Sequence, residues 1–304
     1  MKDELRVGII GFDTSHVPAF SELLNNEKSP YHVPGAKVTA GFPSYSPDLH
    51  ASYSRVEGYK QEMVSKWGIR LVGSVEELLE EVDVVLLESV DGRRHLAEAK
   101  PVILARKPVF IDKPLAASYA DAAAIFRLAQ EYDCPVFSTS SLRFDVNLTA
   151  ILNDPELGEV LGCDAFSPAH LDPTNPGMFW YGIHGVEILY TFMGVGCQSV
   201  TCYATENDHV LVGKWKDGRT GVMRGTRSKA ADYGAMVFGS GKLCHATYNK
   251  EIPLYYPLMK KIAAFFHGAP PPVSAEETLE LMRFIQAALV SENEGGRAVS
   301  LSEI

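Results

Sequence analysis

The sequence predicts an α/β protein of two parts: a doubly wound parallel sheet, followed by an α+β domain with a large, open, mostly antiparallel sheet. In the first part, short apolar runs rich in β-branched residues alternate with helical patterns, which is typical of βαβ units. In the second part, strands follow one another across turn pairs such as Asp217-Gly218, with one helix among them. We place the domains at residues 1–141 and 142–304.

Six strands joined by helices are expected in the first domain. The strands are expected at 6–10, 37–42, 69–72, 82–89, 107–111 and 135–138. The helices are expected at 18–25, within 48–67, directly after the capping box that begins at Ser74, at 95–104 and at 118–132. Because neighbouring parallel strands need a crossover connection, this order favours a parallel sheet with helices on both faces.

The second domain is expected to be rich in strands. A helix at 147–152 precedes strands expected at 159–166, 197–206, 209–215, 220–225, 234–239 and 242–247. Helices are expected at 184–191, 255–266 and 275–290, and those of the tail could pack back on the first domain. These helices can cover only one face of the sheet.

The other face of that sheet predicts self-association. Alternation places Val200, Cys202 and Ala204 on one face and Thr201, Tyr203 and Thr205 on the other. A bare apolar sheet face would be larger than monomers normally expose, and packing against a second copy about a two-fold axis covers it. We therefore expect a homodimer or homotetramer that associates through the sheet of residues 159–247.

Composition and charge exclude several classes of protein. The chain of 304 residues has 28 basic and 38 acidic residues, and its net charge of −10 argues against a nucleic-acid surface. No run is long and uncharged enough to cross a bilayer, and Met1-Lys2-Asp3-Glu4 leads directly into a strand without a leader. The five cysteines lack metal-type spacing. We expect a cytoplasmic protein with reduced thiols.

Lys113 is the first candidate for chemistry. It follows a buried strand of a βαβ unit, so it stands at the carboxyl end of the sheet, where open α/β sheets place their ligands. Pro114 ends the strand and restricts the backbone of Lys113, which fixes the direction of the ammonium group. A lysine held in this way can orient a hydroxyl group or exchange a proton with it.

Five motifs in this order resemble the Gfo/Idh/MocA oxidoreductases along nearly the whole chain. The motifs are Val7-Gly8-Ile9-Ile10-Gly11, Ser89-Val90-Asp91-Gly92-Arg93-Arg94-His95, Asp112-Lys113-Pro114, Leu142-Arg143-Phe144 and Gly182-Ile183-His184-Gly185-Val186-Glu187. The resemblance implies an N-terminal Rossmann domain that binds NAD or NADP. It implies hydride transfer between nicotinamide and a carbinol carbon of a sugar, sugar acid or inositol-like substrate. It also implies Lys113 and His184 as catalytic residues, and association through the C-terminal sheet.

The dinucleotide turn departs from the family pattern. A full turn carries three glycines, and here only Gly11 remains. Either Asp13 and His16 occupy the other two positions, or the loop is shortened; the shortened loop aligns the following helix without a gap. Asp13 would be unfavourable beside a diphosphate unless it caps the helix or is neutralised by His16. The expected cofactor-binding residues are Gly11, Phe12, Asp13, Thr14, Ser15, His16, Ser44, Ser89, Asp91, His95, Asp112 and Lys113.

The choice between NAD and NADP stays open at this point. The second strand lacks the acidic residue that would bind the adenine-ribose hydroxyls. Hydroxyls of Ser44 and Ser46, with Arg55 or Lys60 nearby, could instead suit a 2′-phosphate, and a solvated loop would look the same. Arg93 and Arg94 resemble solvated charges more than ligands.

The substrate side is expected around a loop and a helix start in the second domain. The residues are Lys113, Arg143, His170, Asp172, Trp180, Tyr181 and His184. In relatives an aspartate four residues earlier pairs with the counterpart of His184, and here that position is Trp180. His170 and Asp172 could supply the missing polar partner.

Three other interpretations remain open. His170, Asp172, His184 and Glu187 could together bind zinc or manganese, although polar groups lining a sugar site would look alike, and we assign no metal site. The chain could be a non-redox binding or regulatory module whose degenerate turn no longer seats a diphosphate. It could also be a lyase or epimerase that keeps NAD bound and recycles it within one turnover.

Overall fold

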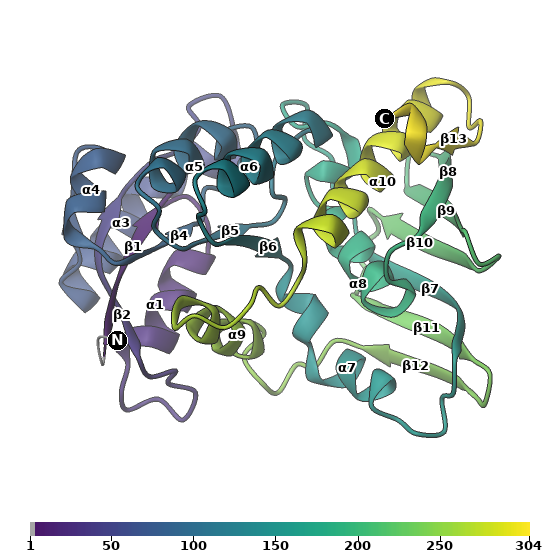
Figure 1. Ribbon diagram of the computed structural model, residues 1–304, viewed down its shortest axis with the longest axis horizontal. Coiled ribbons are helices and arrows are strands. Elements are labelled where there is room, and N and C mark those ends of the chain that lie inside the picture. Colours follow the sequence, from purple (N-terminus) through teal and green to yellow (C-terminus); the bar gives the residue numbers. More distant parts are fainter. Residues whose placement is uncertain (1–3) are drawn as a thin grey trace. The chain divides into compact units, whose positions relative to one another are not determined.

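The computed structural model describes residues 4–304, which divide into two compact units (Figure 1). The first unit contains residues 4–116, Ala120–Ser138 and Tyr255–Ser274, and the second contains Ala117–Tyr119, Thr139–Leu254 and Ala275–Ile304. The chain therefore returns to the first unit after the second sheet, which a single boundary at residue 141 does not describe.

A six-stranded sheet forms the centre of the first unit, in the order β3-β2-β1-β4-β5-β6. Its strands are β1 (Leu5–Ile10), β2 (Ala36–Phe42), β3 (Arg70–Leu71), β4 (Val84–Leu87), β5 (Val109–Asp112) and β6 (Val136–Thr139). The pairings from β3 to β5 are parallel. The order reverses between β1 and β4, so this is the doubly wound sheet expected from the sequence.

Helices cover both faces of this sheet (Figure 1). They are α1 (His16–Asn25), α2 (His50–Tyr53), α3 (Val56–Trp67), α4 (Val75–Glu81), α5 (His95–Leu104), α6 (Tyr119–Glu131) and α9 (Tyr256–Phe266). Ser74 accepts a hydrogen bond from Glu77 N at 3.1 Å and so caps α4, as its sequence pattern predicted. Gly68, with φ at 64°, ends α3.

The second unit contains a seven-stranded sheet in the order β12-β11-β7-β10-β9-β8-β13. Its strands are β7 (Val160–Pro168), β8 (Cys197–Ala204), β9 (Asp208–Trp215), β10 (Thr220–Thr226), β11 (Gly234–Gly239), β12 (Leu243–Thr247) and β13 (Val299–Ser300). β7 and β10 are parallel, and the other pairs are antiparallel. The sheet is therefore mostly antiparallel, as the sequence predicted.

The second unit also has three α-helices and three short 3-10 helices. They are η1 (Ser141–Phe144), α7 (Val146–Leu152), η2 (Gly177–Phe179), α8 (Ile183–Met193), α10 (Ala275–Asn293) and η3 (Leu301–Glu303). Glycines let α8 and α10 approach one face of the sheet closely. A Cβ on Gly213 would lie 2.8 Å from the Phe284 ring of α10, and one on Gly221 would lie 2.9 Å from Leu189 of α8.

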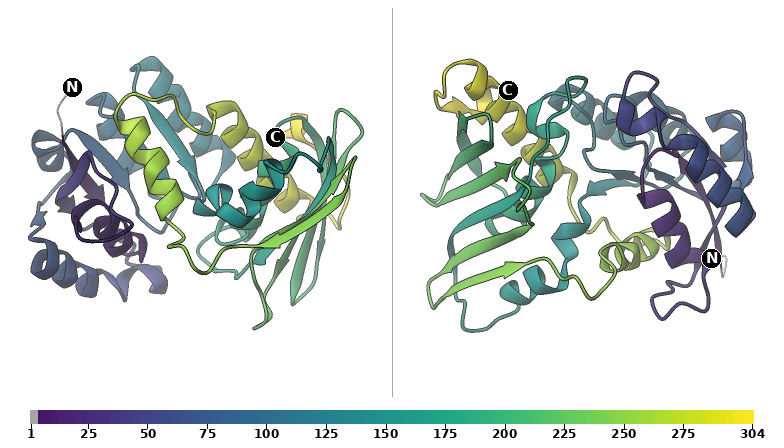
Figure 2. Two further views of the ribbon diagram at one scale, coloured as in Figure 1. Left: turned by 90° about the horizontal axis from the view of Figure 1, so that it is seen from below. Right: turned by 180° about the vertical axis from the view of Figure 1, so that it is seen from behind.

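The two faces of this sheet differ as the alternation predicted. Helices α8 and α10 lie along one face of the sheet (Figure 2). Val200 and Cys202 are buried, whereas Tyr203 is 60 % exposed. Ala204 is exposed despite its expected place in the core, because it lies at the end of β8. The other exposed large apolar side chains of these strands are Leu161, Met236, Phe238 and Leu243.

Two further sequence-based expectations concern the chain as a whole. The five cysteines are free thiols, and four of them are buried. Within residues 4–304, no helix combines the length and apolar character that crossing a membrane requires.

Candidate active site

The turn after β1 needs its single glycine. Gly11 has φ at 89°, and a Cβ at this position would lie 2.3 Å from Ser89 N. α1 begins at His16, and its N-cap residue Ser15 makes no side-chain capping hydrogen bond. The first turn of α1 also carries no acidic residue. The positive end of the α1 dipole therefore remains available to an anion.

Asp13 and Phe12 point into the protein. Asp13 is fully buried, and its carboxylate accepts hydrogen bonds from Ser52 Oγ at 2.5 Å and Val90 N at 2.9 Å. Burial raises the pKa of Asp13. Phe12 is also fully buried and packs on Gly41. Asp13 thus neither caps α1 nor pairs with His16, which corrects both expectations: the turn aims it at donors inside the unit.

The serine hydroxyls beyond β2 bind carboxylates. Ser44 Oγ donates to Glu98, and Ser89 Oγ donates to the other oxygen of Glu98 at 2.6 Å. Ser46 Oγ donates to Asp91 at 2.6 Å. The hydroxyl groups of Ser44 and Ser46, which were considered for a 2′-phosphate, therefore already donate hydrogen bonds to carboxylates.

Three cationic side chains that the sequence analysis considered also form ion pairs within the protein. Arg94 pairs with Glu98 at 2.8 Å, and Arg93 pairs with both Asp91 and Asp48. Lys60, which was considered for a 2′-phosphate, pairs with Glu57 on its own helix at 2.9 Å. The two arginines are ion-paired rather than simply solvated, which corrects the sequence-based interpretation.

His95 connects the ends of β4 and β5. It is fully buried, its Nδ1 lies 2.9 Å from Pro114 O, and its Nε2 lies 2.7 Å from Ser89 O. Both ring nitrogens thus face backbone carbonyl groups. His95 holds the two loops together through its ring nitrogens.

A buried cluster joins the ends of β1, β4 and β5. His16 Nδ1 lies 2.8 Å from Asp112 Oδ2 and 3.5 Å from Glu88 Oε2, and Lys113 Nζ lies 3.6 Å from Asp112 Oδ2. Glu88 was not identified from the sequence. Its signal is an acidic residue directly after the apolar run of β4, where a parallel strand meets the ligand edge.

The pKa values of this cluster respond to burial and to opposite charges. Burial would lower the pKa of His16, but the Asp112 carboxylate outweighs it and the pKa rises to about 9. Burial raises the pKa of Glu88 to about 7, against the effect of His16. Burial would also raise the pKa of Asp112, but the charges of His16 and Lys113 hold it well below its usual range.

In the second unit, His184 lies at the start of α8 and is buried. Its Nδ1 is 2.8 Å from Ser140 Oγ, a residue that the sequence analysis did not identify. The ring packs edge-on against Tyr181 and Tyr233, with centroids 5.3 and 5.6 Å away. Two aromatic rings therefore border this histidine.

The loop before α8 is more exposed. His170 is exposed and packs edge-on against Tyr181 at 5.5 Å. Asp172 accepts hydrogen bonds from Thr174 N and Thr174 Oγ1, at 2.9 and 2.6 Å, and lines a hollow of about 450 Å³ together with Asn175. Trp180, at the end of η2, is half-buried.

Arg143 takes part in a buried ion-pair network. Its Nε donates to Glu187 Oε2 at 2.8 Å, and its Nη1 donates to Glu277. Glu187 also accepts hydrogen bonds from Thr139 Oγ1 and Ser140 N, each at 3.1 Å. Burial raises the pKa of Glu187, against the opposing charge of Arg143. Arg143 is thus positioned by carboxylates of its own unit, and the same contacts hold Glu187 away from the metal cluster considered earlier.

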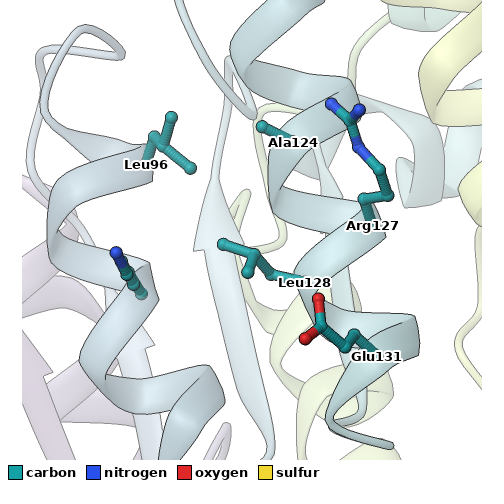
Figure 3. A pocket seen from close by; sticks show the side chains of 6 residues that line it. Leu96, Ala124, Arg127, Leu128 and Glu131 are labelled. Carbon is teal, nitrogen blue, oxygen red and sulfur yellow. The ribbon is translucent and has the colours of Figure 1, made fainter.

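A separate hollow of about 350 Å³ lies between α5 and α6 (Figure 3). Leu96, Ala124 and Leu128 point into it, and its other lining residues are Lys100, Arg127 and Glu131. None of the expected site residues lines this hollow. It offers apolar surface without the convergent polar groups of an active site.

The comparisons with known proteins identify the first unit. Residues 5–140 match the Gfo/Idh/MocA family, described as an oxidoreductase family with an NAD-binding Rossmann fold. This match confirms the resemblance for the three sequence motifs that lie within these residues, and it confirms the expected cofactor class. No curated protein sequence matches this chain.

Solved structures resemble the whole chain. A probable dehydrogenase from Thermotoga maritima superposes with a TM-score of 0.79 at 23 % identity, covering 99 % of this chain and 100 % of that one. GenD2 from gentamicin A biosynthesis, in complex with NAD, gives 0.80 at 17 % identity, with coverages of 99 and 97 %. Scyllo-inositol dehydrogenase from Lactobacillus casei, with NAD(H) and scyllo-inositol bound, gives 0.78 at 12 % identity, with coverages of 98 and 99 %. At these identities the likeness establishes the fold.

Proposed function

Because residues 5–140 belong to the Gfo/Idh/MocA oxidoreductases, we propose that this chain is a nicotinamide-dependent dehydrogenase. It would transfer a hydride between the cofactor and a carbinol carbon of a sugar, sugar acid or inositol-like substrate. The observation that carries the proposal is Lys113. Its ammonium group stands at the carboxyl end of β5, is largely buried, and lies beside the Asp112 carboxylate.

The turn between Gly11 and His16 suits a dinucleotide in part. The uncapped start of α1 would face the diphosphate, and the glycine allows the tight turn below it. Around Ser44 the charged groups are Glu98, Asp91 and the arginines already bound to them. Such a site supports NAD over NADP, since a 2′-phosphate would meet carboxylates and find no uncommitted arginine among Arg93 and Arg94.

Lys113 would exchange the substrate hydroxyl proton. When it is bound, the nicotinamide ring supplies the hydride acceptor. In its neutral amine form, Lys113 holds the hydroxyl group and takes its proton during oxidation, and the Asp112 carboxylate stabilises the ammonium group that forms. His184, held by Ser140, is the second candidate for this proton. Separate variants of the two residues distinguish their roles.

The proposal is tested by cofactor reduction. Purified protein with NAD⁺ is mixed with a panel of inositols, hexoses and sugar acids, and absorbance at 340 nm is followed. We expect turnover with at least one polyol and nearly complete loss of turnover in Lys113→Met. Wild-type kcat in that variant on the same substrate would remove Lys113 from the mechanism.

Two alternatives to a simple dehydrogenase predict different results in this assay. Only Gly11 remains of the three glycines of a full dinucleotide turn, which favours a non-redox module on the same scaffold. An NAD-recycling lyase or epimerase would show tightly bound cofactor and product formation without net change at 340 nm. Chromatography of the reaction mixtures separates this case from an inactive binding module.

We also propose that the exposed face of the second sheet joins copies of this chain. Leu243 is 57 % exposed and Tyr203 is 60 % exposed, and Phe238 lies on the neighbouring β11. Burying such side chains against an equal face stabilises association by about 25 cal/mol per Å² of apolar surface. A homodimer or homotetramer is the expected form.

A further inference from the structure

Three neighbouring strand ends of the first unit bring three metal-ligating side chains together. His16 follows β1, Glu88 follows β4, and Asp112 ends β5. These strands are adjacent and parallel, so their carboxyl ends meet at one edge. The Nδ1 atom and the two carboxylate oxygens all lie within 4.8 Å of one another, and all three residues are buried.

The contacts in this cluster lack the geometry of hydrogen bonds. His16 Nδ1, Asp112 Oδ2 and both carboxylate oxygens of Glu88 are buried without a hydrogen-bond partner, although Nδ1 and Oδ2 are only 2.8 Å apart. Glu88 is 0 % exposed. A buried carboxylate that accepts no hydrogen bond is costly and needs another positive partner.

The separations between these atoms are those of ligands around one ion. Donor atoms at about 2.0 to 2.2 Å from a tetrahedral or octahedral ion lie roughly 2.8 to 3.6 Å from one another. The distances from His16 Nδ1 to Asp112 and Glu88 are 2.8 and 3.5 Å. We propose that His16 Nδ1, Glu88 and Asp112 bind one divalent transition-metal ion.

The ligand set indicates the class of ion. One imidazole and two carboxylates suit Zn²⁺ or Mn²⁺, whereas Mg²⁺ and Ca²⁺ favour oxygen ligands alone. Three protein ligands leave at least one position for an oxygen atom of water or of a ligand. This inference does not depend on the dehydrogenase proposal.

Lys113 competes with the ion for the same carboxylate. Its Nζ lies 3.6 Å from Asp112 Oδ2 and supplies positive charge to the ion-free cluster. A dication would repel this ammonium group. Removing the charge in Lys113→Met should therefore tighten metal binding, a result that a purely structural cluster would not produce.

A second cluster in the other unit provides a contrast. Cys202, His209 and Glu292 also lie within 4.8 Å of one another. Here both nitrogens of His209 are engaged, Nδ1 by Arg227 at 2.9 Å and Nε2 by Glu292 at 3.0 Å. The Arg227 guanidinium group already places a positive charge beside this histidine. Glu292→Gln is therefore the matched control.

The test measures metal content and stability in the full-length protein. Chelator-treated protein is titrated with Zn²⁺ and separately with Mn²⁺ at pH 7.5, followed by calorimetry, elemental analysis after gel filtration, and the melting temperature. We expect one equivalent per chain, a higher Tm, and unchanged binding in Glu292→Gln. Glu88→Gln and Asp112→Asn should each weaken binding by at least tenfold.

Two outcomes would overturn the proposal. One is wild-type protein that retains far less than one equivalent of either metal and shows no shift in Tm. The other is binding that is unaffected by Glu88→Gln and Asp112→Asn. If either variant fails to fold, His16→Gln removes the nitrogen ligand and serves in its place.

Discussion

Replacing Arg143 by methionine should destabilise the second unit strongly at neutral pH. Methionine keeps most of the side-chain length but leaves the buried Glu187 with only Thr139 and Ser140 as hydrogen-bond donors. Breaking a buried ion pair by removing one partner costs about 3 to 5 kcal/mol. Protonation of Glu187 limits this cost, because the buried carboxyl group can bind a proton instead of remaining charged without its partner.

The destabilisation caused by Arg143→Met should depend on pH. In Arg143→Met the folded-state pKa of Glu187 lies well above the unfolded value, so destabilisation grows as pH rises from about 4 to 7 and nearly vanishes below pH 4. At pH 5 it should be about 1 kcal/mol. The fall in Tm at pH 7 should be roughly 6 to 15 °C.

Urea unfolding followed by tryptophan fluorescence measures this change. Trp180 and Trp215 both lie in the second unit and report its unfolding. Arg224→Met is the matched control, because Arg224 is more than half exposed and its contact with Asp208 is 3.5 Å long. It should cost less than about 1 kcal/mol. The reasoning would be refuted if the free energy of unfolding of Arg143→Met fell by less than about 1 kcal/mol at pH 7. A fall that does not change with pH would refute it as well.

Three further predictions follow from the site and the sheet. His184→Ala should lower kcat by roughly 10² to 10⁴ if the imidazole transfers the proton, and an unchanged kcat would assign it a packing role. Burial would raise the pKa of Asp91, but Arg93 and Ser46 outweigh it and hold the pKa below its usual range. The ionised Asp91 therefore stabilises the fold above about pH 4 and loses that effect as pH falls through the folded pKa. Asp91→Asn should cost about 1 to 2 kcal/mol at pH 7 and approach wild-type stability near pH 3, whereas a constant difference in urea unfolding would contradict this. Light scattering should give a multiple of the 33.3 kDa chain mass, and Leu243→Glu should shift it toward one chain; a wild-type mass of one chain at micromolar concentrations would show the sheet interface wrong.

Local patterns predicted most of the secondary structure. The helix at 95–104 and the strand at 234–239 have the expected bounds, because periodicity and turn residues act over a few positions. Strand β13 was not predicted, because two residues are too few to show the alternation of a strand. The return of the tail to the first unit followed from the sequence only as a possibility, without an indication of which helix returns, because a helical pattern indicates an apolar face and does not identify its partner.

The candidate site was predictable in its position and much less in its contacts. The strand end at Lys113 follows from the βαβ pattern. The hydrogen bonds from Ser52 to Asp13 and between Ser140 and His184 join residues 39 and 44 positions apart, and no local pattern encodes them. Glu88 was overlooked because one acidic residue after an apolar run resembles an ordinary strand end until the neighbouring strands are placed.

Binding of the dinucleotide tests the central claim most directly. The purified protein is titrated by calorimetry with NAD⁺, NADH, NADP⁺ and NADPH, and Lys113→Met is titrated in parallel. We expect saturable binding of NAD⁺ or NADH with one site per chain and a Kd below about 1 mM, weaker binding of the phosphorylated forms, and similar affinity in Lys113→Met. Absence of binding for all four forms at millimolar concentration would contradict the account and favour the binding module.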